Sequence, residues 1–213
     1  MRMNALTHEE ATVVIRTAVD NGIDYFDHAD IYGRGTSEEI FGEAFKELGI
    51  ARDSVMLQTK CGIVPGVMFD FSKEHIIASV EGSLKRLQTD YVDALLLHRP
   101  DTLVEPEEVA EAFDELHKAG KVRHFGVSNQ NPMQIELLKK AVTQPLLINQ
   151  LQLSLTHAPM IDAGFNVNMM NNPSFMHDGS VLEYSRISDM TIQPWSPFQA
   201  GNGKKGLFFD HPD

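Results

Sequence analysis

Residues 92–98 have the sequence VDALLLH, a nearly unbroken apolar run that ends in a histidine. This pattern is typical of a strand buried on both faces, as in a parallel sheet. Longer amphipathic stretches separate it from similar runs, which predict further strands at residues 23–27, 55–60, 122–127, 146–151 and 190–195. Strands that alternate with helices imply parallel strands joined by right-handed crossovers. Two α/β architectures fit: a doubly wound open sheet, and a TIM (β/α)8 barrel of which six strands are recognisable here.

Helix-starting signals mark the stretches between the strands. Thr7 followed by Glu10, and Thr36 followed by Glu39, have the spacing of a capping box, in which the two side chains satisfy backbone N–H groups at the start of a helix. Residues 152–179 carry no such signal and are rich in Asn, Met and Gly. They predict a long irregular segment, and a loop of that length in a compact domain is usually functional.

The composition excludes several classes of protein. Of the 213 residues, 42% are hydrophobic and 23% are charged, as in an ordinary globular domain. Cys61 is the only cysteine, which excludes a disulfide scaffold. No apolar run has the length of a membrane span, and a net charge of −12 disfavours nucleic-acid binding. We expect one domain over residues 1–213 and, because the N-terminus lacks the apolar core of a signal peptide, a cytoplasmic protein without membrane or nucleic-acid partners.

The predicted strands all end in polar or amphipathic side chains. These are Asp27, Lys60, His98, Ser128 with Asn129, Gln150, and Trp195 with Ser196. In a barrel the carboxyl ends of all strands surround one axis, so these residues would meet in a single site. An open sheet would instead bind a nucleotide phosphate after one strand, and no GxGxxG follows any strand here. The strand ends therefore favour the barrel.

The residue types at these strand ends point to proton transfer onto a carbonyl group. Tyr32 lies five residues after Asp27 and can reach over the same mouth. A lysine ammonium nearby, held by Asp27, favours the phenolate and makes a tyrosine a better proton donor. None of these side chains can deliver a hydride, so a reduction would need a cofactor. Trp195 can stack on a flat ring, and the Ser, Asn and Gln side chains match the donors and acceptors of a carboxamide.

Six segments together resemble the aldo-keto reductase family. They are GIDYFDHADIYG (22–33), QTKCG (58–62), LLLHRPD (95–101), GKVRHFGVSN (120–129), NQLQ (149–152) and QPWSPF (193–198). The resemblance runs from about residue 22 to residue 201, with the motifs in the family's order. It implies a (β/α)8 barrel that reduces an aldehyde or ketone with NADPH, or with NADH.

The resemblance also implies roles for individual residues. Tyr32 would be the general acid, and Asp27, Lys60 and His98 would complete a catalytic tetrad. Cofactor contacts would come from six residues further along the chain: Ser128, Asn129 and Gln150 at the nicotinamide amide, Trp195 on its ring, and Ser196 and Phe198 along the pyrophosphate. The hydride would pass to the carbonyl carbon while Tyr32 protonates the oxygen.

The chain departs from the family pattern at several places. His28 stands where the family often has a small residue, and we expect it to reshape the pocket floor; Gln130 replaces an aromatic residue. The family's barrel has a strand before the first helix and further elements after the Trp195 strand, including an eighth strand and a basic signature for the 2′-phosphate of NADPH. We expect the chain to be truncated at both ends relative to that barrel. Lys204 and Lys205 are expected to lie in a solvated loop, not in a phosphate site.

Alternative functions stay open at this point. A barrel without its first and eighth strands would expose two sheet edges and could be catalytically impaired. A lyase that uses Lys60 as a Schiff base is a second alternative, although it leaves Tyr32 and Trp195 unexplained. No HExxH or HxH pattern occurs, so no metal site is expected. The sequence leaves open the carbonyl substrate, the choice between NADPH and NADH, and the oligomeric state.

Overall fold

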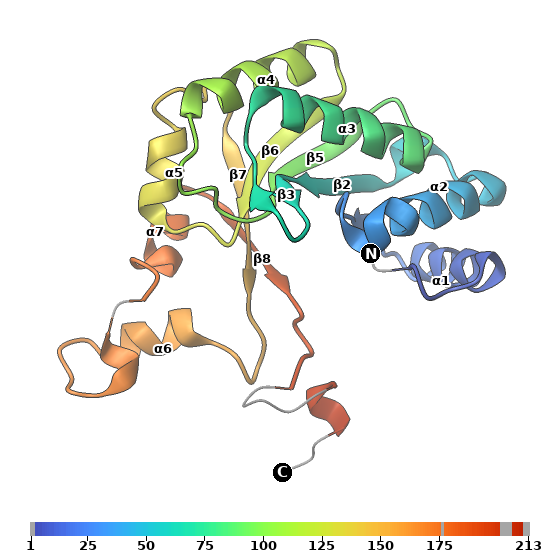
Figure 1. Cartoon of the computed structure of the whole chain (residues 1–213). Helices are drawn as coiled ribbons and strands as arrows, with labels where there is room; N and C mark the ends of the chain where they lie inside the picture. The colour runs from blue at the N-terminus through green and yellow to red at the C-terminus, as the bar shows by residue number, and fades with distance from the viewer. Residues whose placement is uncertain (1–2, 176, 201–205, 211–213) are drawn as a thin grey trace.

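A six-stranded parallel sheet forms the centre of the chain. The computed structural model describes residues 3–175, 177–200 and 206–210. The strands follow one another across the sheet in chain order: β1 (Tyr25–Asp27), β2 (Met56–Cys61), β5 (Val92–Leu97), β6 (Val122–Ser128), β7 (Leu146–Gln152) and β8 (Thr191–Trp195). The sheet curls into a half-barrel, with β1 and β8 as its edges in the described part of the chain (Figure 1). This confirms the incomplete (β/α)8 barrel and excludes the doubly wound sheet, whose strand order reverses part-way.

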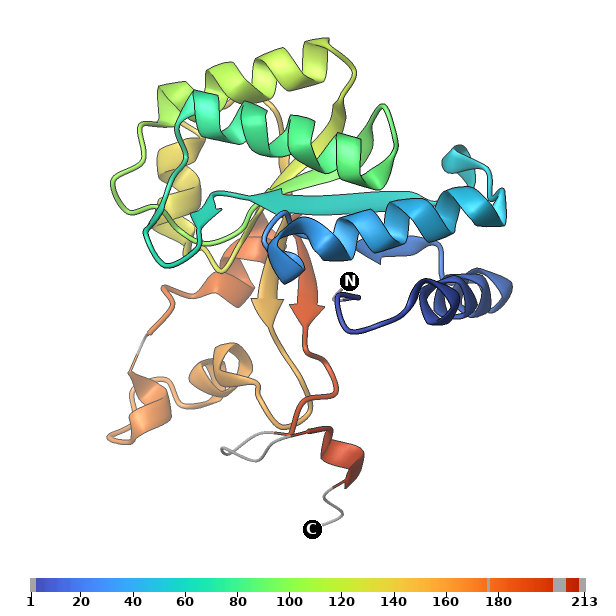
Figure 2. The same ribbon diagram turned by 45° about the vertical axis from the view of Figure 1, so that its right-hand side comes forward.

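One helix precedes β1 and the others connect successive strands, and the first five pack against one another in chain order. They are α1 (His8–Asp20), α2 (Thr36–Leu48), α3 (Lys73–Leu87), α4 (Pro106–Lys118), α5 (Pro132–Leu138) and α7 (Val181–Ile187). In Figure 1, α2, α3 and α4 arch over one side of the sheet, and Figure 2 shows α1 beyond α2 at the end of the row. Among the described residues, no helix is both long and apolar enough to cross a membrane.

Strand β5 is buried on both faces, as its sequence predicts. Leu95 and Leu97 belong to the core between the sheet and the helices, while Leu96 points the opposite way and lies against Gly126 of β6. A Cβ at Gly126 would come within 2.7 Å of the Leu96 side chain, so the small residue lets the neighbouring strand close up. Successive side chains of a strand alternate between the two faces, so the other face of β5 lines the hollow of the half-barrel.

Asp93 is the one charged residue within this apolar strand, and its partners account for its burial. The residue is only 3% exposed, and its carboxylate accepts hydrogen bonds from Arg52 (2.7 Å) and Arg123 (2.9 Å). The Leu57 backbone N–H donates to it as well, at 2.9 Å. A buried carboxylate is tolerated when it is paired and hydrogen-bonded in this way.

The two predicted capping boxes have different outcomes. The box at Thr7 and Glu10 is confirmed, with both reciprocal hydrogen bonds present at the start of α1. The prediction of a box at Thr36 and Glu39 is wrong, because Thr36 is already inside α2 and Gly35 is the N-cap residue. A short 3₁₀ helix, η1 (Tyr32–Gly35), turns the chain into α2, and the Thr36 hydroxyl donates to the carbonyl of Gly33 instead (2.7 Å).

The segment 152–179 is less irregular than its composition suggests. It contains helix α6 (Pro159–Phe165) and the 3₁₀ helix η3 (Asn172–Ser174), which extend beyond the carboxyl ends of β7 and β8 in Figures 1 and 2. The sequence also gives no signal for a small antiparallel hairpin of β3 (Ile63–Val64) and β4 (Met68–Phe69). Further 3₁₀ turns are η2 (Arg52–Ser54) and η4 (Phe208–Asp210). The predicted solvated pair Lys204 and Lys205 lies outside the described residues.

Candidate active site

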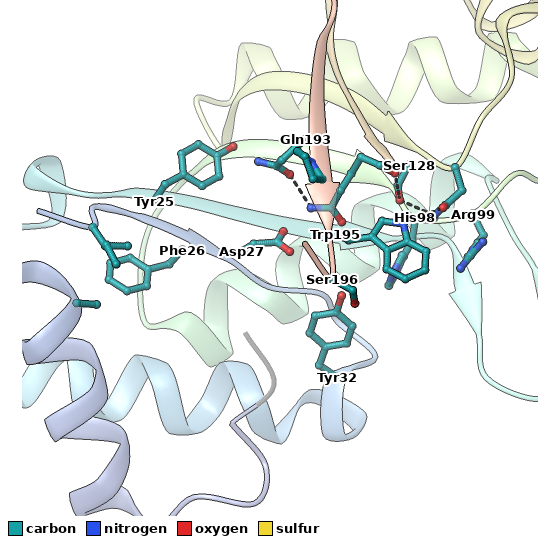
Figure 3. Close-up of a pocket in the computed structure, with 15 residues that line it drawn as sticks. Tyr25, Phe26, Asp27, Tyr32, His98, Arg99, Ser128, Gln193, Trp195 and Ser196 are labelled. Carbon is teal, nitrogen blue, oxygen red and sulfur yellow. Dashed lines mark hydrogen bonds between the residues drawn. The ribbon is translucent and has the colours of Figure 1, made fainter. Parts of the chain in front are cut away.

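The hollow of the half-barrel contains a cavity of about 770 Å³ that reaches from strand β1 to strand β8. Most of the predicted site residues line it: Asp27, Tyr32, His98, Ser128, Asn129, Gln150, Trp195 and Ser196. In Figure 3 the Asp27 carboxylate, the Tyr32 hydroxyl group and the Trp195 ring lie around this space. The carboxyl ends of the strands bring together side chains that are up to 169 positions apart in the chain, from Asp27 to Ser196 (196 − 27).

Lys60 and Asp27 form a tight ion pair at the base of this cavity. The Lys60 side chain is fully buried, and its Nζ donates to the two carboxylate oxygens of Asp27 at 2.7 and 2.8 Å. It donates a third hydrogen bond to the backbone carbonyl of His28 at 2.6 Å. A buried ammonium is costly unless it is paired and hydrogen-bonded. The three acceptors therefore hold Lys60 charged and fixed in direction.

Tyr32 is held close to this ion pair by the loop after β1. The turn 29–32 is closed by a hydrogen bond from the Tyr32 N–H to the carbonyl of Ala29 (3.0 Å). The Tyr32 hydroxyl oxygen lies 3.4 Å from Lys60 Nζ. The His98 ring packs edge-on to the Tyr32 ring, with ring centroids 5.8 Å apart. The four residues of the predicted tetrad are thus brought together, with the phenol hydroxyl and the imidazole beside the cavity.

A second group of side chains lies at the ends of β6, β7 and β8. Asn129 adopts a left-handed backbone conformation (φ 57°), its side-chain amide donates to Ser128 Oγ (2.7 Å), and Trp195 Nε1 donates to its Oδ1 (3.0 Å). The Ser128 hydroxyl donates to the backbone carbonyl of Gln150 at 3.0 Å. These bonds fix hydroxyl, amide and indole groups on the side of the cavity opposite Asp27.

Three further polar side chains belong to the site and were missed in the sequence. Gln58 donates to Asp27 Oδ1 (2.6 Å) and to Gln193 Oε1 (2.7 Å), and it accepts from the Tyr25 hydroxyl (2.7 Å). Gln150 Nε2 donates to the same Gln193 oxygen at 2.6 Å. Tyr25, Gln58 and Gln193 each stand two positions before a predicted site residue on the same strand. Residues two apart share a face of a strand, so this spacing was the available signal.

Two predicted residues lie elsewhere. Phe198 is 53% exposed, does not line the cavity, and packs against Phe208 and Phe209. His28 was expected to reshape the pocket floor, and that expectation is wrong. Its side chain is fully buried on the helix side of the sheet, with its ring edge-on to Phe41 of α2 at 4.4 Å, because neighbouring residues of an extended segment point to opposite faces.

Charged groups are also buried behind the loop that carries Tyr32. Burial is the main cause that lowers the pKa of His28 well below its usual value, with the Lys60 charge acting in the same direction. Burial and then the neighbouring Glu38 carboxylate raise the pKa of Asp30 to about 6. Glu38 itself is fully buried and accepts from Thr59 Oγ1 (2.6 Å) and Arg86 Nε (2.8 Å). Among the described residues, no group of His, Cys, Asp or Glu is arranged to hold a metal ion.

Comparison with known proteins identifies the family. The family model "Aldo/keto reductase family" matches residues 1–203. The chain belongs to the aldo-keto reductase family. It is 43% identical to the uncharacterized oxidoreductase YcsN of Bacillus subtilis. The match extends over 212 residues and covers 94% of this chain and 65% of YcsN. It is also 36% identical to a 6-dehydroglucose reductase of Agrobacterium fabrum. That match extends over 203 residues and covers 91% of this chain and 63% of the relative.

Solved structures of aldo-keto reductases share this fold. The aldo/keto reductase of Klebsiella pneumoniae in complex with NADP and acetate superposes with a TM-score of 0.71 at 26% identity, covering 92% of this chain and 60% of that one. The chain thus spans about 60% of these aldo-keto reductases and less than two thirds of the curated relatives described above. The shared part is the half-barrel, which carries the tetrad residues and the side chains of Ser128, Asn129 and Trp195.

Proposed function

We propose that this chain carries the reducing centre of an NADP(H)-dependent carbonyl reductase, which converts an aldehyde or ketone to an alcohol. The observation that supports the proposal most directly is the 3.4 Å approach of the fully buried Lys60 ammonium to the Tyr32 hydroxyl beside an open cavity. Membership of the aldo-keto reductase family and the NADP-bound Klebsiella structure support the nicotinamide cofactor.

The residues at the ends of β6, β7 and β8 have the chemistry that a nicotinamide ring requires. Ser128, Asn129 and Gln150 would hold the carboxamide, since hydroxyl and amide groups supply both donors and acceptors there. Trp195 offers a flat surface for the ring, and its hydrogen bond to Asn129 fixes the indole (3.0 Å). Ser196 and Phe198 are proposed to follow the pyrophosphate. When bound, a reduced nicotinamide supplies the hydride for the carbonyl carbon.

The tetrad residues would supply the proton. Tyr32 donates its hydroxyl proton to the carbonyl oxygen as negative charge develops there, and His98 adds a polar contact on the same side of the cavity. The Lys60 ammonium stabilises the charge left on the Tyr32 oxygen, and Asp27 keeps Lys60 charged and oriented. Because the Lys60 ammonium already donates to Asp27 and to the His28 carbonyl, it has no free lone pair for a Schiff base. This disfavours the lyase alternative.

The test compares the wild-type chain with Tyr32→Phe. We expect Tyr32→Phe to lower kcat for reduction of a small aldehyde by roughly 10²- to 10⁴-fold, the usual contribution of a general acid. Because Trp195 is the only tryptophan, its fluorescence reports cofactor binding separately. NADPH should quench it equally in both proteins, and a parallel titration with NADH measures the cofactor preference. The proposal is wrong if neither cofactor binds the wild-type chain, or if Tyr32→Phe reduces aldehydes as fast as the wild type.

A further inference from the structure

Three glutamines connect the two sides of the hollow in the half-barrel. Gln58 of β2 is the register partner of Asp27 in β1, and Gln150 of β7 is the register partner of Gln193 in β8. Gln58 Nε2 donates to Gln193 Oε1 at 2.7 Å, a contact between residues 135 positions apart in the chain. This bond joins the tetrad side of the cavity, at β1 and β2, to the side proposed to hold the nicotinamide amide.

The Asp27 carboxylate determines which group donates at each step of this chain of amides. An ionised carboxylate only accepts hydrogen bonds, so Gln58 must present its NH₂ group to Asp27 (2.6 Å). The other N–H of that amide goes to Gln193, and its oxygen accepts from the Tyr25 hydroxyl group (2.7 Å). Gln193 Oε1 also accepts from Gln150 Nε2 at 2.6 Å. The orientation of each amide therefore follows from the one before it.

Gln150 is the end of this chain of amides that meets the cavity (Figure 3). Its NH₂ group is held by Gln193, and no group among the described residues donates a hydrogen bond to its Oε1. Gln150 thus offers an acceptor to a ligand, and the NH₂ group of a nicotinamide carboxamide is a matching donor. Gln58 is fully buried and is not among the lining residues, so it acts on a ligand only through its neighbours.

We propose that Gln58 is a positioning residue for both sides of this reducing centre. It holds the Asp27 carboxylate that orients Lys60. Through Gln193 it also holds the Gln150 amide, whose oxygen accepts from the carboxamide NH₂ group of the cofactor. The inference rests on the proposed function, because it concerns the same cavity and the same cofactor. A glutamine with a purely structural role would stabilise the sheet without this selective effect on the carboxamide.

The first test measures the coupling between Gln58 and the carboxamide. Quenching of Trp195 fluorescence compares the binding of NADP⁺ with that of its acetylpyridine analogue, in which a methyl group replaces the amide NH₂ group. Gln58→Met keeps the length of the side chain and removes the amide. It should weaken NADP⁺ binding roughly threefold to tenfold, the value of one neutral hydrogen bond. Binding of the analogue should be unchanged, whereas a structural loss would weaken both ligands equally.

The second test measures kcat and KM for reduction of a small aldehyde at saturating NADPH. Gln58→Met should lower kcat roughly tenfold to a hundredfold, the value of a hydrogen bond to a charged group. The KM for the aldehyde should change little, because Gln58 does not line the cavity. Gln144→Met is the matched control: Gln144 Nε2 also donates to an aspartate, Asp114 (2.5 Å), but Gln144 does not line the cavity. It should change neither cofactor binding nor kcat.

All measurements are made well below the melting temperature of the least stable variant, so that a loss of stability does not account for either result. If Gln58→Met does not fold, Gln193→Met breaks the same link at a half-buried position and should show the same selective loss of NADP⁺ binding. The proposal is overturned if the variant binds NADP⁺ as tightly as the wild type, if it weakens both ligands equally, or if Gln58→Met retains the wild-type kcat. If the wild type binds neither ligand, the proposed function fails with it.

Discussion

Replacing Asp30 with Asn should stabilise the protein at neutral pH. Asp30 lies in the loop between Asp27 and Tyr32, its N–H donates to the Lys60 carbonyl (3.1 Å), and its Oδ1 is buried without a partner among the described residues. Burial and then the Glu38 carboxylate raise its pKa to about 6, against the opposing effects of Ser79, Arg86 and the Ile31 N–H. The folded state therefore binds this proton more tightly than the unfolded state does.

The sign and size of the effect follow from this pKa. The unfolded carboxyl group ionises near its ordinary pKa of 3.8, and the folded one near about 6. Stability is lost as the pH rises from about 4 to about 6, and the full cost is present above that range. A difference of about two units corresponds to on the order of 3 kcal/mol. In a chain of this size this is an increase in Tm of about 6–12 °C for Asp30→Asn at neutral pH.

The assay is thermal unfolding of wild type and Asp30→Asn at a series of pH values from about 4 to about 7.5. The two proteins should have similar Tm values at the acidic end and diverge as the pH rises. Asp53→Asn, at an exposed position in η2, controls for the loss of one negative charge. The reasoning would be refuted if Asp30→Asn lowers the Tm at neutral pH, or if its effect does not change with pH.

Other variants test the packing and the site. Arg86→Met should destabilise the protein by about 3–5 kcal/mol in urea unfolding at neutral pH, because it leaves the buried Glu38 carboxylate without its cation (2.8 Å); a loss below 1 kcal/mol would contradict this. Leu95→Ala, at a fully buried position of β5, should cost about 2–5 kcal/mol in the same assay. Trp195→Phe removes the hydrogen bond to Asn129 and should weaken cofactor binding, measured by calorimetry, with no change in Tm beyond a few degrees.

The sequence was sufficient to predict the strands and the residues at their ends. Buried parallel strands leave a strong local pattern, because runs such as 92–98 must be apolar on both faces. The polar residues that end them, such as Lys60 and Gln150, interrupt that pattern where the chain reaches the cavity. Since parallel strands start and end together, these interruptions also predicted which side chains would lie close to one another.

Features that depend on contacts between distant segments were not predictable in this way. The start of α2 is set by the turn 32–35, whose left-handed residues place Thr36 inside the helix. Helix α6 is only seven residues long and contains Gly164, so its sequence has weak helical periodicity. The bonds of Gln58 to Asp27 and Gln193 join β2 to both edges of the sheet, and no local pattern records such a closure.

Two buried carboxylates on the helix side of the sheet contrast with the buried Lys60 in the hollow of the half-barrel. On the helix side of the sheet, Asp93 and Glu38 are each matched by arginines and backbone or hydroxyl donors, which is what stability alone requires. In the hollow of the half-barrel, Lys60 is satisfied as well, but its partners Asp27 and Tyr32 face an open cavity. This open side is what the proposed proton transfer from Tyr32 requires, because the substrate must reach the phenol hydroxyl group.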